Sequence, residues 1–120
     1  MVVPVSLSIP NKITYVSAEP VVPLTIEEKI LEHLPPVFID IAKAESRLKP
    51  TAYNPEWHYD RLGRPLCQGS FGVLQIACIH FEGYKGNYDV ETNLELAKKV
   101  YAAQGFDAWG VCYRRLVSCK

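Results

Sequence analysis

The chain has 120 residues and no net formal charge, because thirteen basic side chains balance thirteen acidic ones. This length fits one domain with one modest hydrophobic core. A phosphate-rich partner usually requires a basic patch or stripe, and the sequence has none, which argues against nucleic acid as a partner. It also has no run of about 18 apolar residues, so no transmembrane segment is predicted.

The N-terminal part differs in composition from the rest. Residues 1–24 contain four prolines and show no helical periodicity. Because proline interrupts long strands, we expect an extended arm or linker here. The start, MVVPVSLSIPNK, lacks the basic and continuous apolar regions of a secretory signal. The domain proper is expected to cover residues 25–120, beginning at Thr25 with the capping-box pattern TIEE.

Apolar residues recur at helical spacing in three segments, which predicts helices over 25–34, 36–47 and 89–105. Asp89 is the expected cap of the third helix, and Gly105 closes it. A last short helix is expected over 107–119, in DAWGVCYRRLVSC.

Helical periodicity is lost between Thr51 and Ser70. Loops of this length are usually functional or clamped. The apolar run GVLQIACIHF, residues 72–81, fits either a buried helix or a strand. The predicted fold is therefore mainly α, with at most a small β element around residues 55–75.

The four cysteines are Cys67, Cys78, Cys112 and Cys119. An even count in a small domain favours two disulfides over free thiols. If a helix continues through Cys112 and Cys119, they lie roughly 10 Å apart along its axis, too far for a disulfide. Cys78–Cys112 is therefore the favoured pair, because both residues follow elements expected to flank one core. Cys67–Cys119 would then be the second disulfide.

A zinc site is the alternative use of Cys67 and Cys78, together with His58 and His80. The spacing lacks the close CxxC pair that is typical of such sites. No metal and no cofactor are therefore predicted.

The stretch IAKAESRLKP, residues 41–50, places Glu45 at the end of a mostly apolar helical run. A carboxyl group beside apolar groups loses hydration of its charged form, so its pKa rises. It can then donate a proton to a leaving oxygen, as in glycoside cleavage. The structural alternative is an exposed Glu45 paired with Lys49 at i,i+4, and this stretch alone favours that alternative.

A second stretch changes this balance. GSFGVLQI, residues 69–76, combines two glycines that permit close backbone approach with the polar residues Ser70 and Gln75. The amide of Gln75 can both donate and accept hydrogen bonds, as recognition of a sugar amide or hydroxyl requires.

The order of these motifs resembles the lytic transglycosylase domain of the lysozyme superfamily, in the branch that includes goose-type lysozyme. The resemblance runs from Pro36 to Tyr113, and its most specific parts are the Glu-Ser pair and the Gly-x-x-Gln-Ile core. The matching residues are Glu45-Ser46, Ala52, Asn54, GSFGVLQI, Asn93 and YAAQGFDAWG.

The resemblance implies a mainly α, lysozyme-like (α+β) fold with a cleft for peptidoglycan strands. Glu45 would protonate the oxygen between N-acetylmuramic acid and N-acetylglucosamine. It would then take the proton of the C6 hydroxyl, closing a 1,6-anhydro ring without water. Ser70 and Gln75 would hydrogen-bond the substrate, whereas Asn93 matches a structural asparagine.

The chain departs from the family pattern near its end. The family often has an Ala-Tyr-Asn segment whose tyrosine reaches the glutamate, but this chain has DAWG, with Trp109. Tyr101 is the other candidate for that hydroxyl. Trp57 is a candidate for stacking on sugar faces.

A hydrolase of this type needs a second carboxylate, and Asp60 and Glu56 are the candidates. We prefer transglycosylation, because neither residue lies in a motif of the family. Hydrolysis, as in goose-type lysozyme, and a non-catalytic glycan-binding module are the alternatives. The inferred substrate implies an extracytoplasmic location, and a monomer is expected.

Overall fold

A computed structural model describes residues 22–120, so nearly all of the predicted arm, residues 1–21, lies outside the described residues. The longer elements are, in order, α1 (Ile26–His33), α2 (Val37–Ser46), β1 (Tyr53–Tyr59), β2 (Pro65–Phe71), β3 (Ile76–Ala77), α3 (Val90–Gln104) and α4 (Gly110–Tyr113). Short 3-10 helices cover Cys78–His80, Glu82–Tyr84 and Gly105–Ala108.

The fold is mixed α+β, so the prediction of a mainly α fold was wrong. Helices account for 47% and strands for 16% of the described residues, and the strands form one antiparallel sheet in the order β1-β2-β3. The stretch from Thr51 to Ser70 is an ordered hairpin instead of an irregular loop. The hairpin turns at Asp60, whose carboxylate accepts the backbone N–H groups of Leu62 and Arg64, both at 2.9 Å.

The predicted helix boundaries agree well with the structure for α1 and α3. Thr25 and Glu28 form the expected capping box, and the Asp89 side chain accepts the Thr92 N–H. Helix α2 ends earlier than predicted, at Ser46, because the next two residues have left-handed backbones, with φ of 54° at Arg47 and 61° at Leu48.

The last predicted helix is much shorter than expected, and the predicted disulfide pairing was therefore wrong. The bridges are Cys67–Cys78 and Cys112–Cys119. Helix α4 stops at Tyr113, and the chain turns back, so that the Leu116 N–H donates to the Val111 carbonyl at 2.8 Å. This turn brings the Cα atoms of Cys112 and Cys119 to 5.6 Å from each other.

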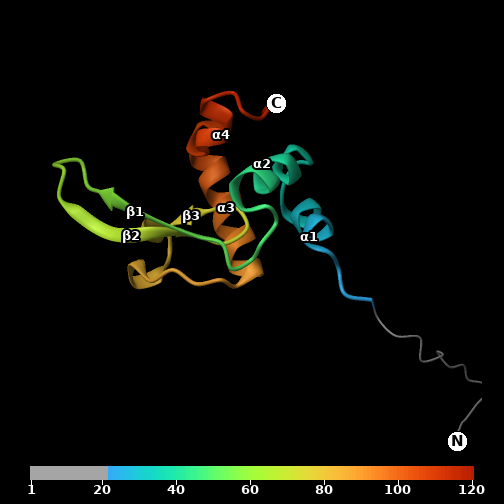
Figure 1. Cartoon of the computed structure of the whole chain (residues 1–120), viewed down its shortest axis with the longest axis horizontal. Coiled ribbons are helices and arrows are strands. Elements are labelled where there is room, and N and C mark those ends of the chain that lie inside the picture. Colours follow the sequence, from blue (N-terminus) through green and yellow to red (C-terminus); the bar gives the residue numbers. More distant parts are fainter. Residues whose placement is uncertain (1–21) are drawn as a thin grey trace, which may run out of the picture.

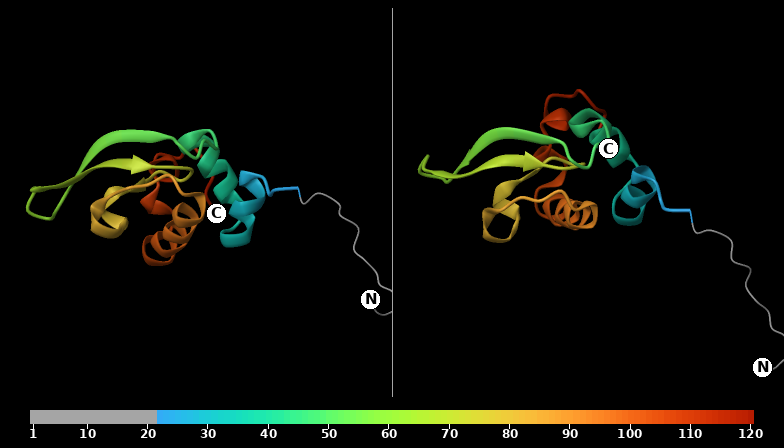
Figure 2. Two further views of the ribbon diagram at one scale, coloured as in Figure 1. Left: turned by 90° about the horizontal axis from the view of Figure 1, so that it is seen from below. Right: turned by 60° about the horizontal axis from the view of Figure 1, so that its bottom comes forward.

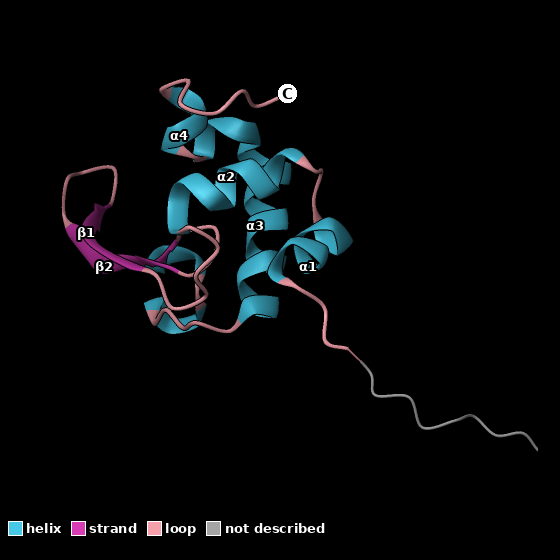
Figure 3. Ribbon diagram, turned by 45° about the vertical axis from the view of Figure 1, so that its right-hand side comes forward, coloured by secondary structure: helices cyan, strands magenta, loops and turns pink. Residues whose placement is uncertain are grey.

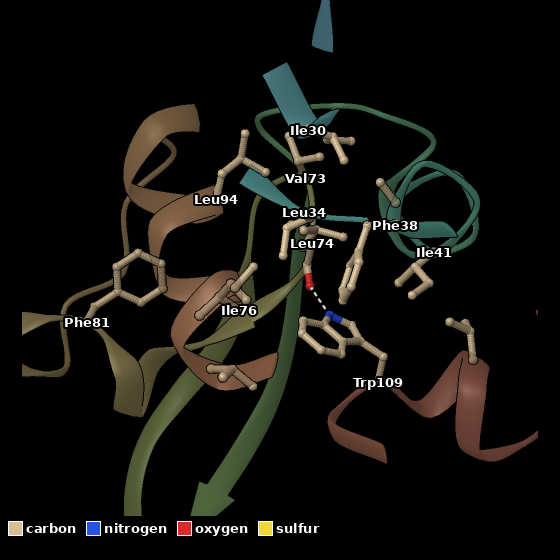
Figure 4. Packing of buried hydrophobic residues seen from close by; sticks show 14 residues of the cluster. Ile30, Leu34, Phe38, Ile41, Val73, Leu74, Ile76, Phe81, Leu94 and Trp109 are labelled. Carbon is tan, nitrogen blue, oxygen red and sulfur yellow. Dashed lines mark hydrogen bonds between the residues drawn. The ribbon is translucent and has the colours of Figure 1, made fainter. Parts of the chain in front are cut away.

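One hydrophobic core joins the helices to the segment between β2 and β3. Phe38 of α2 packs edge-on against Trp109, with ring centroids 4.9 Å apart. The Trp109 indole N–H donates to the Leu74 carbonyl at 2.9 Å, so this buried polar group is satisfied (Figure 4). The core thus joins the starts of α2 and α4 to the segment that contains Leu74.

The hairpin and the helices occupy different parts of the molecule. Figure 1 shows β1 and β2 extending beyond the helices, and α1 at the opposite end. The two other views in Figure 2 and the colouring in Figure 3 show the same separation. Within residues 22–120, none of the helices has the length and apolar character needed to cross a membrane.

Candidate active site

A cleft of about 280 Å³ lies where the hairpin meets the helices. Its lining is mainly polar and includes two carboxyl groups, two imidazoles and one guanidinium. The lining residues are Glu45, Asn54, Glu56, His58, Ser70, Gln75, Ile76, Ala77, His80, Val100, Gln104, Ala108, Trp109, Gly110 and Arg114.

Glu45 occupies the last turn of α2, and its half-buried side chain lines this cleft. The predicted alternative, an ion pair with Lys49, is absent: no ion pair within residues 22–120 joins these two residues. The reason is the helix end at Ser46, which removes the i,i+4 geometry that the pair would need.

The cleft holds the pKa of Glu45 above its ordinary value. Burial is the largest cause, because it removes hydration from the charged form. The positive charge of Arg114 acts in the opposite direction, and the negative charge of Glu56 adds a smaller increase. A carboxyl group in this environment is suited to hold a proton and then donate it.

The second wall of the cleft comes from alternate residues of β1. Asn54, Glu56 and His58 line the cleft, as expected for side chains two apart on a strand. Trp57 lies between them in sequence and is 51% exposed, and the cleft lining does not include it. The predicted substrate contact of Trp57 is therefore not part of this cleft.

Two buried polar side chains, Ser46 beside Glu45 and Asn93 of α3, bond to the GSFGVLQI stretch. Ser46 donates to the Val73 carbonyl at 2.7 Å. Asn93 accepts the Leu74 N–H at 2.9 Å and donates to the Phe71 carbonyl at 2.7 Å. The structural role predicted for Asn93 agrees with these bonds, and the two most specific parts of the sequence pattern are in direct contact.

Gly72 leaves room for this arrangement. Its φ is 81°, and an added Cβ would lie 2.5 Å from Nδ2 of Asn93. Any side chain there would displace the asparagine and strain the backbone.

Gln75 also lines the cleft, but its amide N–H groups are engaged with the protein. They donate to the carbonyls of Gly72, at 3.0 Å, and Ala52, at 3.2 Å. Its backbone φ is 51°, which is unusual for a residue other than glycine. The carbonyl oxygen is the group of this amide that can serve a ligand, so Gln75 is suited to accept a hydrogen bond.

Ser70 is buried at the cleft and shares a hydrogen bond of 3.3 Å with the imidazole of His58. His80 lies close by, and its pKa is lowered, first by burial and then by the charge of His58. A neutral imidazole at His80 offers one donor and one acceptor to a ligand.

The other predicted site residues lie outside the cleft. Asp60 pairs with Arg64 at the hairpin turn, with 2.7 Å between carboxylate and guanidinium, and the Arg64 backbone N–H keeps the pKa of Asp60 below its ordinary value. Tyr101 packs against Phe38 and Phe106 at the core. Of the two candidates for a second carboxylate, only Glu56 therefore lines the same cleft as Glu45.

The zinc alternative does not fit the structure, because Cys67 and Cys78 are bonded to each other and cannot act as thiolate ligands. The bridge joins β2 to the 3-10 helix after β3, so it fastens the hairpin near the cleft. Among residues 22–120 there is no group of three or more His, Cys, Asp or Glu side chains placed to hold a metal ion.

The sequence alone favoured a solvated face for Arg114 and Arg115, with contact to the peptide carboxylates of a cell wall as the alternative, and it did not separate the two residues. It missed the joint placement of His58 and Glu56 in the cleft. For β1 a signal was present, because Asn54, Glu56 and His58 are polar residues two apart, the period of a strand with one polar face. For Arg114 the signal was weak, since its position depends on where α4 ends.

The assembled site combines a carboxyl group with a raised pKa, a second carboxyl group, and several hydrogen-bond donors and acceptors. Comparison with known proteins adds no assignment: no family model, no curated protein and no solved structure matches the chain. The function must therefore be inferred from the residues of the cleft and their geometry.

Proposed function

We propose that the protein cleaves peptidoglycan as a lytic transglycosylase, with Glu45 as its general acid and base. The observation that carries this proposal is the environment of Glu45: a half-buried carboxyl group with a raised pKa, at a polar cleft. The contact between Ser46 and Val73 supports it, because it joins the two motifs that carry the resemblance to this family.

In this reaction protonated Glu45 donates its proton to the oxygen between N-acetylmuramic acid and N-acetylglucosamine. The bond from that oxygen to the muramic acid C1 then breaks. The Glu45 carboxylate takes the proton of the muramic acid C6 hydroxyl, whose oxygen bonds to C1 and closes the 1,6-anhydro ring. Glu45 ends the cycle protonated, so no second catalytic carboxylate is required.

Hydrolysis is the second candidate, and Glu56 is the observation that favours it. Glu56 lines the same cleft and is close enough for its charge to affect the pKa of Glu45. In an inverting hydrolase such a carboxylate activates a water molecule on the opposite face of the sugar. Asp60 is no longer a candidate, because it lies at the hairpin turn.

The first test is digestion of purified peptidoglycan by the wild type and by Glu45→Gln, followed by mass analysis of the released fragments. We expect anhydro-muropeptides from the wild type and at least a ~100-fold lower rate from the variant, because general acid–base catalysis contributes about 10²–10⁴. Fragments with reducing ends would instead identify a hydrolase. If the wild type bound peptidoglycan without cleaving it, the protein would be a glycan-binding module.

The variant should remain folded, which separates a chemical role from a structural one. Ionising a carboxyl group whose folded-state pKa is raised costs folding free energy as the pH rises through that pKa. Glutamine removes this cost, so the melting temperature of Glu45→Gln at neutral pH should equal or exceed that of the wild type. Equal activity of both proteins would remove Glu45 from the mechanism.

Two further features are compatible with work on the cell wall. Both disulfides belong to the described domain, and such bridges persist in oxidising, extracytoplasmic environments. An extracytoplasmic location therefore forms part of the proposal.

A further inference from the structure

We propose that Arg114 binds a carboxylate of the substrate, next to the bond that Glu45 cleaves. The inference rests on the proposed function and extends it, because it names the chemical group that would distinguish peptidoglycan from an uncharged glycan.

Arg114 is the one lysine or arginine among the residues that line the cleft. It is close enough for its charge to act on Glu45, yet no ion pair within residues 22–120 neutralises it. Of its five N–H donors, the structure engages the Nε one, which donates to the Gly110 carbonyl at 3.3 Å. The terminal N–H groups are thus left for a ligand.

The backbone around Arg114 is well anchored. Its own N–H also donates to Gly110, at 2.8 Å, and the adjacent turn bonds to the carbonyl of Val111, a residue of the core. The Cys112–Cys119 bridge closes this turn. Because the backbone of this segment is already fixed, only the side chain of Arg114 has to be ordered when it binds. The planar fork of its guanidinium fits a carboxylate through two parallel hydrogen bonds.

The neighbouring arginine provides a matched control. Arg115 has the same side chain, but it lines a separate hollow with Cys112, Ser118 and Lys120 and does not reach the cleft. Arg114 lines the cleft and Arg115 does not. An effect of Arg114→Gln that Arg115→Gln lacks is therefore local to the cleft and does not come from the general loss of a positive charge.

Peptidoglycan offers two carboxylate sources near the scissile bond. One is the lactyl group of the muramic acid, which is free when the peptide has been removed. The other is the peptide stem itself. Both would meet the guanidinium through the same chemistry, so the experiment must include both substrates.

The test compares wild type, Arg114→Gln, Arg114→Lys and Arg115→Gln on soluble glycan strands with and without peptide stems. Each substrate is also prepared with its carboxylates converted to neutral methylamides. We expect Arg114→Gln to raise KM about 10- to 100-fold on the charged strands, the range of a charge-assisted hydrogen bond, with a smaller change in kcat. Lysine should recover part of this loss, and Arg115→Gln should behave as the wild type.

On the methylamide strands the wild type and Arg114→Gln should have equal KM values. On the charged strands, a difference in KM between the two proteins on strands without peptide identifies the lactyl carboxylate. A difference on strands with peptide stems identifies the stem carboxylate. An equal effect of Arg114→Gln on charged and blocked strands would overturn the proposal. Equilibrium binding of the same strands to wild type and Arg114→Gln is measured in parallel. If the wild type does not cleave the strands, the proposed function is wrong. The difference in Kd between the two proteins still decides whether Arg114 binds the carboxylate.

Discussion

The two walls of the cleft are built in different ways. The helical wall consists of the end of α2, residues 72–75 and the start of α4, and it is held by the core and by buried hydrogen bonds. The hairpin wall, β1 and β2, extends beyond the helices and is mostly exposed (Figure 1). The group proposed to carry the proton, Glu45, lies on the buried wall, whereas the hairpin brings polar groups that modify its environment.

This difference has a physical consequence. Burial is the largest cause of the raised pKa of Glu45, and it needs a packed surface, which a two-stranded ribbon alone does not provide. The hairpin instead presents alternate side chains to the cleft, so Glu56 and His58 reach it while Trp57 faces elsewhere. Separate substitutions in each wall should therefore affect different properties of the protein.

The largest effect is expected from Asn93→Ala in the helical wall. Asn93 is 1% exposed, and its loss leaves the Leu74 N–H and the Phe71 carbonyl without their partner. Two unsatisfied buried groups cost about 2–5 kcal/mol of unfolding free energy. Urea denaturation measures this loss, and cleavage should fall as well because residues 72–75 lose their support.

The control on the same helix is Lys98→Ala, at an exposed position, which should change stability by less than about 0.5 kcal/mol. If Asn93→Ala were as stable as this control, the bonds of Asn93 would not support the cleft wall.

A smaller loss is expected when the hairpin wall is released by Cys67→Ala together with Cys78→Ala. The bridge spans a sequence separation of 11, and closing a loop of this size stabilises a protein by about 3 kcal/mol. The effect on cleavage should come from the hairpin, since β1 carries Glu56 and His58.

The C-terminal bridge is the matched comparison, because it spans a separation of 7 and lies in the other wall. Its removal, by Cys112→Ala with Cys119→Ala, should weaken the binding of charged strands more than that of methylamide strands. Identical substrate profiles for the two double variants would contradict the division of the cleft into two independent walls.

Helices α1 and α3 were the part that the sequence predicted best. The capping residues Thr25 and Asp89 defined two helices, and the apolar period identified their buried faces. Glu45, Ser70 and Gln75 were chosen as candidates from their motifs, and the structure brings all three to one cleft. These features depend on residues close in the chain, where local patterns carry the information.

The hairpin wall and the C-terminus were predicted poorly for identifiable reasons. The loss of helical periodicity between Thr51 and Ser70 indicated a loop, yet β1 tolerates Pro55 at an irregularity of its pairing with β2. The pairing of Cys112 with Cys119 depended on one helix end, because a continued helix would have kept them apart. The position of Arg114 in the cleft depends on the same turn, so one helix boundary determined both conclusions.

The smallest effect, and the most informative about the two walls, is expected from Glu56→Gln. The charge of Glu56 contributes to the raised pKa of Glu45, so its removal should lower that pKa. If Glu45 acts as a protonated acid, the alkaline limb of the kcat/KM profile then moves to lower pH, while the rate on the acid side remains near that of the wild type. Arg114→Gln should move the same limb in the opposite direction, because the Arg114 charge lowers the pKa of Glu45.

Trp57→Ala, on the same strand but outside the cleft, should leave the profile unchanged. Loss of activity of Glu56→Gln at every pH would instead indicate that Glu56 activates water, and reducing-end products from the wild type would agree with that result. A shifted limb with retained activity would mean that the hairpin adjusts a proton held by the helical wall. A shifted limb in Glu56→Gln, as opposed to loss of activity at every pH, therefore distinguishes an enzyme with a single catalytic carboxyl group from one that needs both carboxyl groups for the chemistry itself.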